Sequence, residues 1–174
     1  MAKFNLKTGQ MQKKQGAETV ASGAYPAMIV HIVDVGDYAY IAGEPCKRST
    51  AFTFQLPSGV LITKIIPNSI HELSIMMTIV SSVGDAEDLE DLLGKKLVLE
   101  VEANKFYPKI KGYYSLEFFD EFQDTTFPDI PSVFLLPEGD AESIDVKSNI
   151  AVIKTLPNEI RKIMLRARSK KATL

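Results

Sequence analysis

The residues best suited to chemistry lie in one short stretch, residues 105–113, which reads KFYPKIKGY. If this stretch forms a β-strand, alternate side chains point to the same side of the sheet. One side then carries two tyrosines and two lysines: Tyr107, Lys109, Lys111 and Tyr113. Binding of single-stranded nucleic acid requires rings that stack on bases, at about 1–3 kcal/mol each, and lysines that neutralise phosphates. An exposed sheet face without a ligand also has this composition, because tyrosine favours strands.

Further candidate contacts for a nucleic acid lie beside this row and in the loop after the first predicted strand. That loop is of the kind that contacts oligonucleotides in small barrels. The candidates are Lys105, Phe106, Tyr38, Tyr40, Lys47 and Arg48. A last candidate, Lys64, interrupts an apolar strand, and we expect it to face outward near the end of a hairpin.

Signatures of enzymes are largely missing from the chain. Neither GxxxxGK[ST] nor GxGxxG occurs, and His31, His71 and Cys46 are far apart in sequence. Glu100, Glu102 and Lys105 only faintly resemble the acidic clusters of metal-dependent nucleases, and a solvated strand face explains them better. We therefore expect no catalytic residues, no metal site and no cofactor.

The row of candidates must be positioned by a mainly β fold. Alternation and turn residues predict strands at about 25–35, 50–56, 60–66, 97–102 and 107–118, with Pro57-Ser58-Gly59 as a hairpin turn. In the last strand, Ile110, Tyr114, Leu116 and Phe118 should face away from the row. A helix with a capping box at Ser69 and Glu72 should bury Leu73, Met76, Met77 and Val80 and end at Gly84.

Three strands, a helix and two strands are the element order of the OB-fold, a five-stranded Greek-key barrel that binds oligonucleotides or oligosaccharides. Other small barrels and α+β sandwiches also have this order. We assign the core to residues 21–119 and a mobile arm to residues 1–20, which lack hydrophobic periodicity. Residues 120–174 should form an acidic arm, a short strand at 150–153 and a terminal helix. This helix opens at Pro157 and has Ile160, Ile163, Met164 and Ala167 on one face.

Charge is unevenly distributed, although 20 Lys and Arg nearly balance 22 Asp and Glu. Residues 112–146 contain nine acidic residues and no basic one, whereas residues 154–174 contain seven basic residues and one acidic. A net charge of −2 would by itself argue against a nucleic-acid partner. Segregation into blocks is nevertheless typical of binding surfaces, tails or solvated faces. With no apolar segment long enough for a membrane span or a signal sequence, we expect a soluble, cytoplasmic protein without a membrane partner.

Three stretches resemble the phage-encoded OB-fold single-stranded-DNA-binding proteins: SGAYPAMIVHIVDVG, EDLEDLLGKKLVLEVEANKFYPKIKGY and LPNEIRKIM. The resemblance covers about two-thirds of the chain. It implies a protein that coats and protects single-stranded DNA, without strong sequence preference, in phage DNA replication or recombination. Its location would then be the host cytoplasm.

The chain departs from that family in the position of its acidic, aromatic segment. Many such proteins end in an acidic tail that docks replication partners, but here EFFDEFQDTTFPDIPSVF is internal and the last residues, RARSKKATL, are basic. The acidic arm, residues 117–145, would therefore either recruit replication or recombination proteins or pack on a neighbouring subunit in a homo-oligomer. The alternative function is a phage structural or assembly protein that uses its charged arms for subunit contacts.

Overall fold

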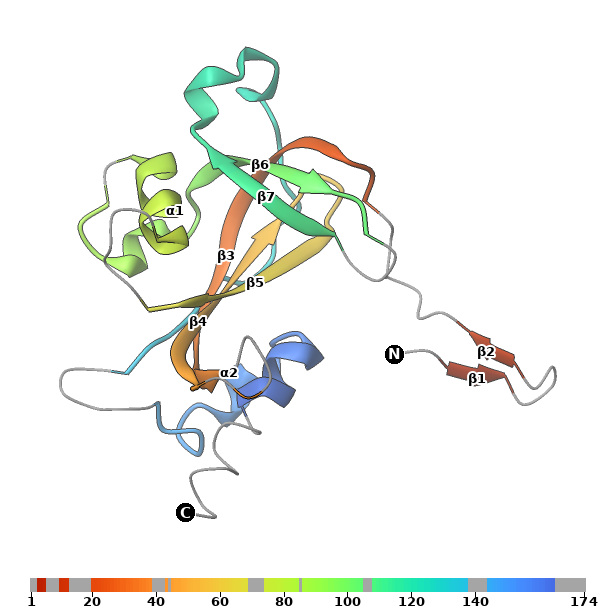
Figure 1. Cartoon of the computed structure of the whole chain (residues 1–174), viewed down its shortest axis with the longest axis vertical. Coiled ribbons are helices and arrows are strands. Elements are labelled where there is room, and N and C mark those ends of the chain that lie inside the picture. The colour runs from red at the N-terminus through yellow and green to blue at the C-terminus, as the bar shows by residue number, and fades with distance from the viewer. Residues whose placement is uncertain are drawn as a thin grey trace.

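The architecture is a six-stranded sheet built around one long strand (Figure 1). The computed structural model describes residues 3–5, 10–12, 20–38, 43, 45–68, 74–84, 86–104, 108–137 and 144–164. The strands of the sheet are β3 (Gly23–Tyr38), β4 (Lys47–Gln55), β5 (Leu61–Pro67), β6 (Lys96–Glu102), β7 (Lys109–Tyr114) and β8 (Val133–Leu135). A separate antiparallel pair, β1 (Lys3–Asn5) and β2 (Gln10–Gln12), precedes it. The sequence analysis did not predict these two strands.

Strand β3 is shared by three partners along its 16 residues. Its first part pairs with β6 and the remainder with β4, both antiparallel, while β8 runs parallel to residues 31–33. Register shifts between Ile29 and His31 and between Asp34 and Gly36 bend the strand, as bulges do. The antiparallel strands follow the order β5-β4-β3-β6-β7, and among the described residues no ladder joins β5 to β7.

The predicted class, mainly β with three strands, a helix and two strands, is confirmed for the core. The turn between β4 and β5 forms where predicted, with Gly59 at a φ of 91°, a conformation that favours glycine. Helix α1 (Ile75–Val83) begins later than expected, because the Ser74 side chain caps it by accepting from the Met77 N–H. It ends at Gly84, as predicted, whereas Ser69 and Glu72 lie outside the described residues.

Several boundaries differ from the prediction. Strand β7 ends at Tyr114 and is followed by two 3-10 turns, η2 (Leu116–Phe118) and η3 (Asp120–Phe122); another, η1 (Leu89–Leu92), precedes β6. The predicted strand at 150–153 is wrong, since Ile150–Ile153 is a short helix, α2. The extra strand is β8 instead. The terminal helix is confirmed over residues 158–164, where Ile160 and Met164 are buried.

Two hydrophobic clusters hold the sheet. The first includes inward residues of five strands together with α1, among them Ile29, Ile32, Phe52, Phe54, Ile79 and Leu99. The second joins β3 and β4 to the C-terminal segment through Val33, Val35, Ala51, Leu135, Leu156, Ile160 and Met164. The segment after β7 therefore packs against the sheet as part of the fold. None of the helices in the described ranges has the length and apolar character needed to cross a membrane.

Candidate nucleic-acid interface

A bulge in β7 decides which side chains reach the outer face. Lys109 pairs with Glu102 and Ile110 with Val101, but Gly112, not Lys111, pairs with Glu100. Lys111 is thus an extra residue on β7. Because a bulge places two residues opposite one, the alternation of side chains is reversed beyond it.

Tyr113 is consequently turned toward the core, and its predicted place on the outer row is wrong. Its partner across the ladder is the buried Leu99, and its ring lies 5.9 Å from that of Phe54. Its hydroxyl is buried and has no hydrogen-bond partner among the described residues. This burial raises the pKa of Tyr113 far above its ordinary value.

Tyr114 takes the outer place that was predicted for Tyr113. Tyr114 is 44% exposed, and its hydroxyl donates a 2.8 Å hydrogen bond to Glu100. The hydrogen bond and the charge of Glu100 together raise the pKa of Tyr114. The ring folds back over Gly112, where an added Cβ would lie 2.7 Å from the Tyr114 hydroxyl oxygen. A residue without a side chain at 112 therefore suits this position of the ring.

The two lysines of the predicted row, Lys109 and Lys111, are exposed as expected. The Nζ atom of Lys111 lies 3.1 Å from a carboxylate oxygen of Glu102, and both side chains are about half exposed. An exposed pair of this kind contributes about 0–1 kcal/mol, so Lys111 can exchange Glu102 for a phosphate at small cost. The face thus combines two lysines with two carboxylates, those of Glu100 and Glu102.

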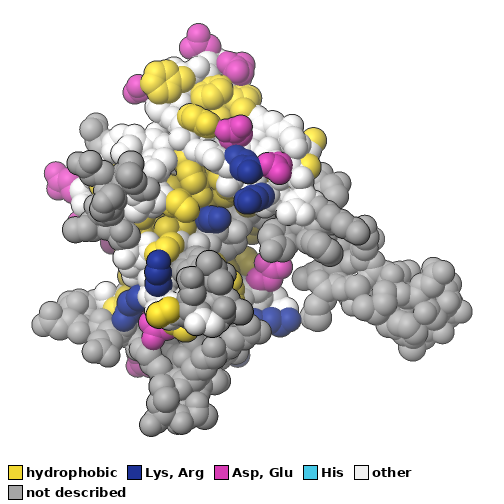
Figure 2. All heavy atoms as spheres, in the orientation of Figure 1, with side chains coloured by type: hydrophobic (Ala, Val, Ile, Leu, Met, Phe, Trp, Pro, Cys, Tyr) yellow, Lys and Arg dark blue, Asp and Glu magenta, His cyan; other side chains and the backbone are white. Residues whose placement is uncertain are grey.

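Beside the lysines lies a groove of about 470 Å³. It is lined by the start of β3, by β6 and β7, and by the turn after β7: Ser22, Gly23, Ala24, Glu100, Val101, Glu102, Lys111, Tyr114 and Phe119. The Phe119 ring lies 6.5 Å from Tyr114 and stacks on Phe122 at 5.7 Å. Figure 2 shows basic side chains in the middle of this view, over β7, and acidic and hydrophobic ones at the top, over η2 and η3.

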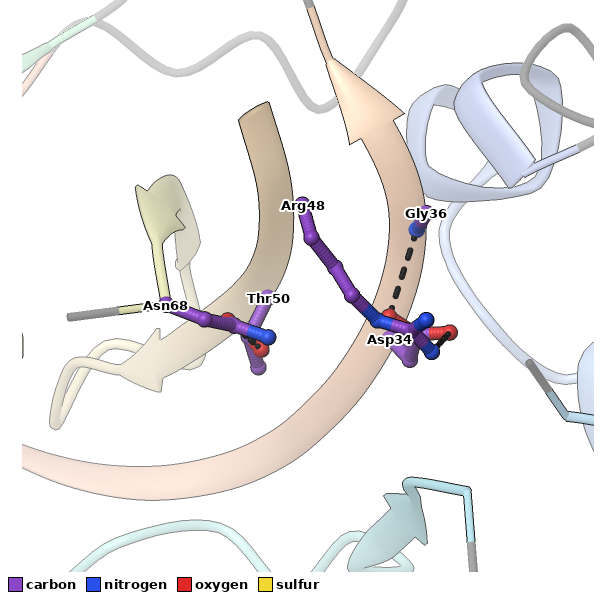
Figure 3. Close-up of polar contacts among 5 residues, drawn as sticks. All are labelled: Asp34, Gly36, Arg48, Thr50 and Asn68. Atoms are coloured by element: carbon purple, nitrogen blue, oxygen red, sulfur yellow. Dashed lines mark hydrogen bonds and ion pairs between the residues drawn. The ribbon is translucent and has the colours of Figure 1, made fainter. Parts of the chain in front are cut away.

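The contacts predicted in the loop after the first strand lie at the other end of β3 from the groove; the described ones are Tyr38, Lys47 and Arg48. Arg48 there forms an ion pair with the buried Asp34, with 3.2 Å between the guanidinium and the carboxylate (Figure 3). The other carboxylate oxygen of Asp34 accepts from the Gly36 N–H. Lys47 is exposed and pairs across the ladder with the half-buried Tyr38. The structure therefore does not bring this group together with Lys109 and Lys111.

Lys64 does not face outward near a hairpin end, and that prediction is wrong. It pairs with Phe52 in the middle of β5, on the same side as the buried Ile62 and Ile66. Because β5 is at an edge of the sheet, a half-buried lysine can place its stem along the core and its ammonium group in water. The remaining candidates, Tyr40, Lys105, Phe106 and Tyr107, lie outside the described residues, as does His71.

His31 is a core residue on the side of β3 that the C-terminal segment covers. Burial lowers its pKa, and a hydrogen bond with the backbone of Pro131 partly opposes this. Its Nδ1 atom has no partner within the described ranges. In those ranges no three His, Cys, Asp or Glu side chains come close enough together to hold a metal ion.

Sequence reasoning missed Tyr114 and Phe119 as groove residues. The available signal was Gly112, since glycine within a strand often marks a bulge. Phe119 has no comparable signal, because its position depends on how η2 folds back onto β7. No protein-family model matches this chain, and no curated protein matches it either.

Proposed function

We propose that this protein binds single-stranded DNA without strong sequence preference and without catalysing a reaction. The observation that carries the proposal is the outer face of β7, where Lys109, Lys111 and Tyr114 are exposed beside the groove. Its setting in phage DNA replication or recombination follows from the sequence resemblance.

The strand arrangement supports an OB-fold, which is the finer part of the proposal. Counting from β3, the order strand–strand–strand–helix–strand–strand is kept, and β3 pairs with both β4 and β6. Such sharing of the first strand is what a small Greek-key barrel requires, because it must curl the sheet around one core. The two bulges in β3 supply that curvature.

The chemistry of the face suits a flexible strand better than a duplex. Tyr114 and Phe119 offer two ring surfaces to unstacked bases, and base stacking is tolerant of sequence. Lys109 and Lys111 would contact phosphates, while Glu100 and Glu102 would keep the backbone of the DNA on the lysine side of the groove. Because these two carboxylates offset the charge of the two lysines, the face as a whole is not strongly positive. Binding would therefore depend on the placement of the rings and lysines as well as on charge.

The proposal is tested by fluorescence anisotropy with labelled oligo-dT. The double variant Lys109→Ala/Lys111→Ala should bind more weakly and show a shallower salt dependence. With about 0.7 counterions released per phosphate of a single strand, loss of two contacts reduces the slope of log K against log salt by about 1.4. Tyr114→Ala should lose about 5- to 160-fold in affinity, whereas Tyr114→Phe, which keeps the ring, should stay close to the wild type.

The matched control is Lys95→Ala/Lys147→Ala, which removes two exposed lysines that do not line the groove. It should leave both the affinity and most of the salt slope in place. Wild-type protein that fails to bind oligo-dT at low salt would overturn the proposal. Full affinity and an unchanged slope in Lys109→Ala/Lys111→Ala would do so as well.

A further inference from the structure

The turns that follow β7 form an exposed surface of which the proposed DNA contact uses only the Phe119 ring. We call residues 115–124, which include η2 and η3, the aromatic–acidic corner. Phe118 in this corner is 80% exposed, more than any other large hydrophobic residue in the described ranges. Single exposed apolar residues are common, so the acidic residues beside Phe118 in the sequence must be considered together with it.

The corner holds Phe118 outward by a defined set of hydrogen bonds. The Ser115 hydroxyl accepts from the Glu117 N–H at 3.3 Å, which fixes the start of η2. The side-chain amide of Gln123 donates to the carbonyl oxygens of Leu116, at 2.7 Å, and Phe119, at 3.3 Å. The stacked Phe119 and Phe122 rings close the turn from the other side. A backbone held in this way has little conformational freedom left to lose when a partner binds.

The charged residues of the corner are all acidic. Four exposed carboxylates belong to it: Glu117, Asp120, Glu121 and Asp124. The nearest basic residues in the sequence are Lys111 on one side and Lys147 on the other. In Figure 2 the acidic and hydrophobic side chains gather together at this end of the molecule. An apolar ring within carboxylates fits a segment that combines basic and apolar residues, and arginine can also stack on the ring.

This chain contains a segment with that chemistry, residues 154–174. It holds seven of the chain's 20 basic residues and one acidic residue, and its last ten residues read LRARSKKATL. Its described part, the helix at 158–164, is anchored by Ile160 and Met164 in the second hydrophobic cluster. Figure 1 shows α2 and this helix at the opposite end of the molecule from η2 and η3.

We infer that the aromatic–acidic corner of one copy binds the basic segment 154–174 of a second copy. Because the corner and the described helix of that segment, residues 158–164, lie at opposite ends of the molecule (Figure 1), the contact is head-to-tail and can repeat from copy to copy. A row of this kind would make the coating of a DNA strand cooperative, and only that use of the contact rests on the proposed function. The contact itself requires no DNA.

Sedimentation velocity of the full chain, without DNA and over a range of concentrations, measures the contact. The wild type should associate at low salt and dissociate as salt rises, since salt screens the attraction between the acidic corner and the basic segment. Phe118→Ser should weaken association by about tenfold or more, as expected for loss of a central aromatic anchor. The charge reversals Asp120→Lys/Glu121→Lys and Arg166→Glu/Arg168→Glu should each weaken it, and combining all four substitutions should restore it.

The control variant Glu87→Lys/Glu90→Lys reverses two exposed carboxylates near η1 and should associate like the wild type. A wild type that stays monomeric at low salt overturns the inference. Association that survives Phe118→Ser and both charge reversals, or that the combined variant fails to restore, also overturns it. Anisotropy with an oligonucleotide that accommodates one copy keeps the two proposals apart, because Phe118→Ser should bind it with unchanged affinity.

Discussion

Replacing Arg48 with alanine tests whether this residue contacts DNA or stabilises the fold. The sequence placed Arg48 among the DNA contacts, but the structure pairs its guanidinium with Asp34 at 3.2 Å. The Asp34 side chain is 1% exposed and that of Arg48 33% exposed. Arg48→Ala would therefore leave a buried carboxylate without its counter-ion.

The size of the effect follows from these exposures. Removing one partner of a fully buried ion pair costs about 3–5 kcal/mol, whereas an exposed pair contributes about 0–1 kcal/mol. Here only the carboxylate is fully buried, and it keeps the hydrogen bond from the Gly36 N–H at 3.3 Å. We therefore expect Arg48→Ala to lower the free energy of unfolding by about 2–3 kcal/mol.

Urea denaturation at neutral pH, followed by far-UV circular dichroism, gives the free energy of unfolding of each protein from the midpoint and slope of the transition. The double variant Asp34→Leu/Arg48→Met is the informative control, because it removes the carboxylate together with its partner. It should be more stable than Arg48→Ala, since no unpaired charge is left buried. Affinity for oligo-dT, measured where both proteins are folded, should be the same for Arg48→Ala and wild type. A stability loss below about 0.5 kcal/mol, the range of ordinary surface substitutions, together with weaker DNA binding would refute this assignment.

Two further predictions concern buried groups without a full set of partners. Because burial lowers the pKa of His31 in the folded state, the unfolded chain takes up its proton first, near the ordinary value of 6.5. The free energy of unfolding should therefore fall as pH falls through 6.5 toward the lower folded pKa. His31→Leu should reduce that part of the pH dependence in denaturation curves. A variant whose free energy of unfolding differs between pH 7.5 and pH 5.5 by as much as that of the wild type would contradict this prediction. Tyr113→Phe removes a buried hydroxyl that has no partner in the described structure, so the free energy of unfolding should stay equal or rise by about 1 kcal/mol. A loss above about 1 kcal/mol would mean that the hydroxyl is bonded.

The parts of the fold that the sequence predicted well depend on local chemistry. The hairpin of β4 and β5 follows from the alternation of Phe52 and Phe54 and from a proline–glycine turn. The end of α1 follows from Gly84, which has a φ of 84°. These features need no knowledge of distant residues, because the backbone conformation that they require is favoured by the residue itself.

The orientation of the candidate site could not be predicted in the same way. A strand with regular alternation would place Tyr113 outside and Tyr114 inside, and one extra residue, Lys111, reverses both. Whether β7 contains a bulge depends on its register with β6, which alternation within β7 does not encode. With the bulge, the Tyr113 ring packs beside Phe54 and the Tyr114 hydroxyl donates to Glu100.

The C-terminal segment was mispredicted for a related reason. Ile150–Ile153 is a short apolar run, and such a run is compatible with either a strand or a helix. The surrounding residues 138–149 are mostly polar or acidic, which suggested an arm. What holds the segment is a set of separated apolar residues, including Ile144, Ile153 and Leu156, that meet only when the chain folds against β3 and β4.

The C-terminal segment that packs on β3 and β4 also determines which face of the sheet a DNA strand could reach. In an OB-fold, the architecture proposed for this chain, the ligand commonly lies over the second and third strands, which would be β4 and β5. The outward residues Ala51, Thr53 and Gln55 of β4 are all buried, however, and the Gln55 amide donates to the Pro128 carbonyl at 2.8 Å.

A DNA strand on β4 would have to displace residues 128–135 and the second hydrophobic cluster, whereas the groove of β6 and β7 is already open. Removing residues 120–174 would expose that cluster and destabilise the sheet, so a truncated chain would confuse loss of binding with loss of folding. Point substitutions on the surface of β7 separate the two effects, because Lys109, Lys111 and Tyr114 can each be changed while both clusters stay packed.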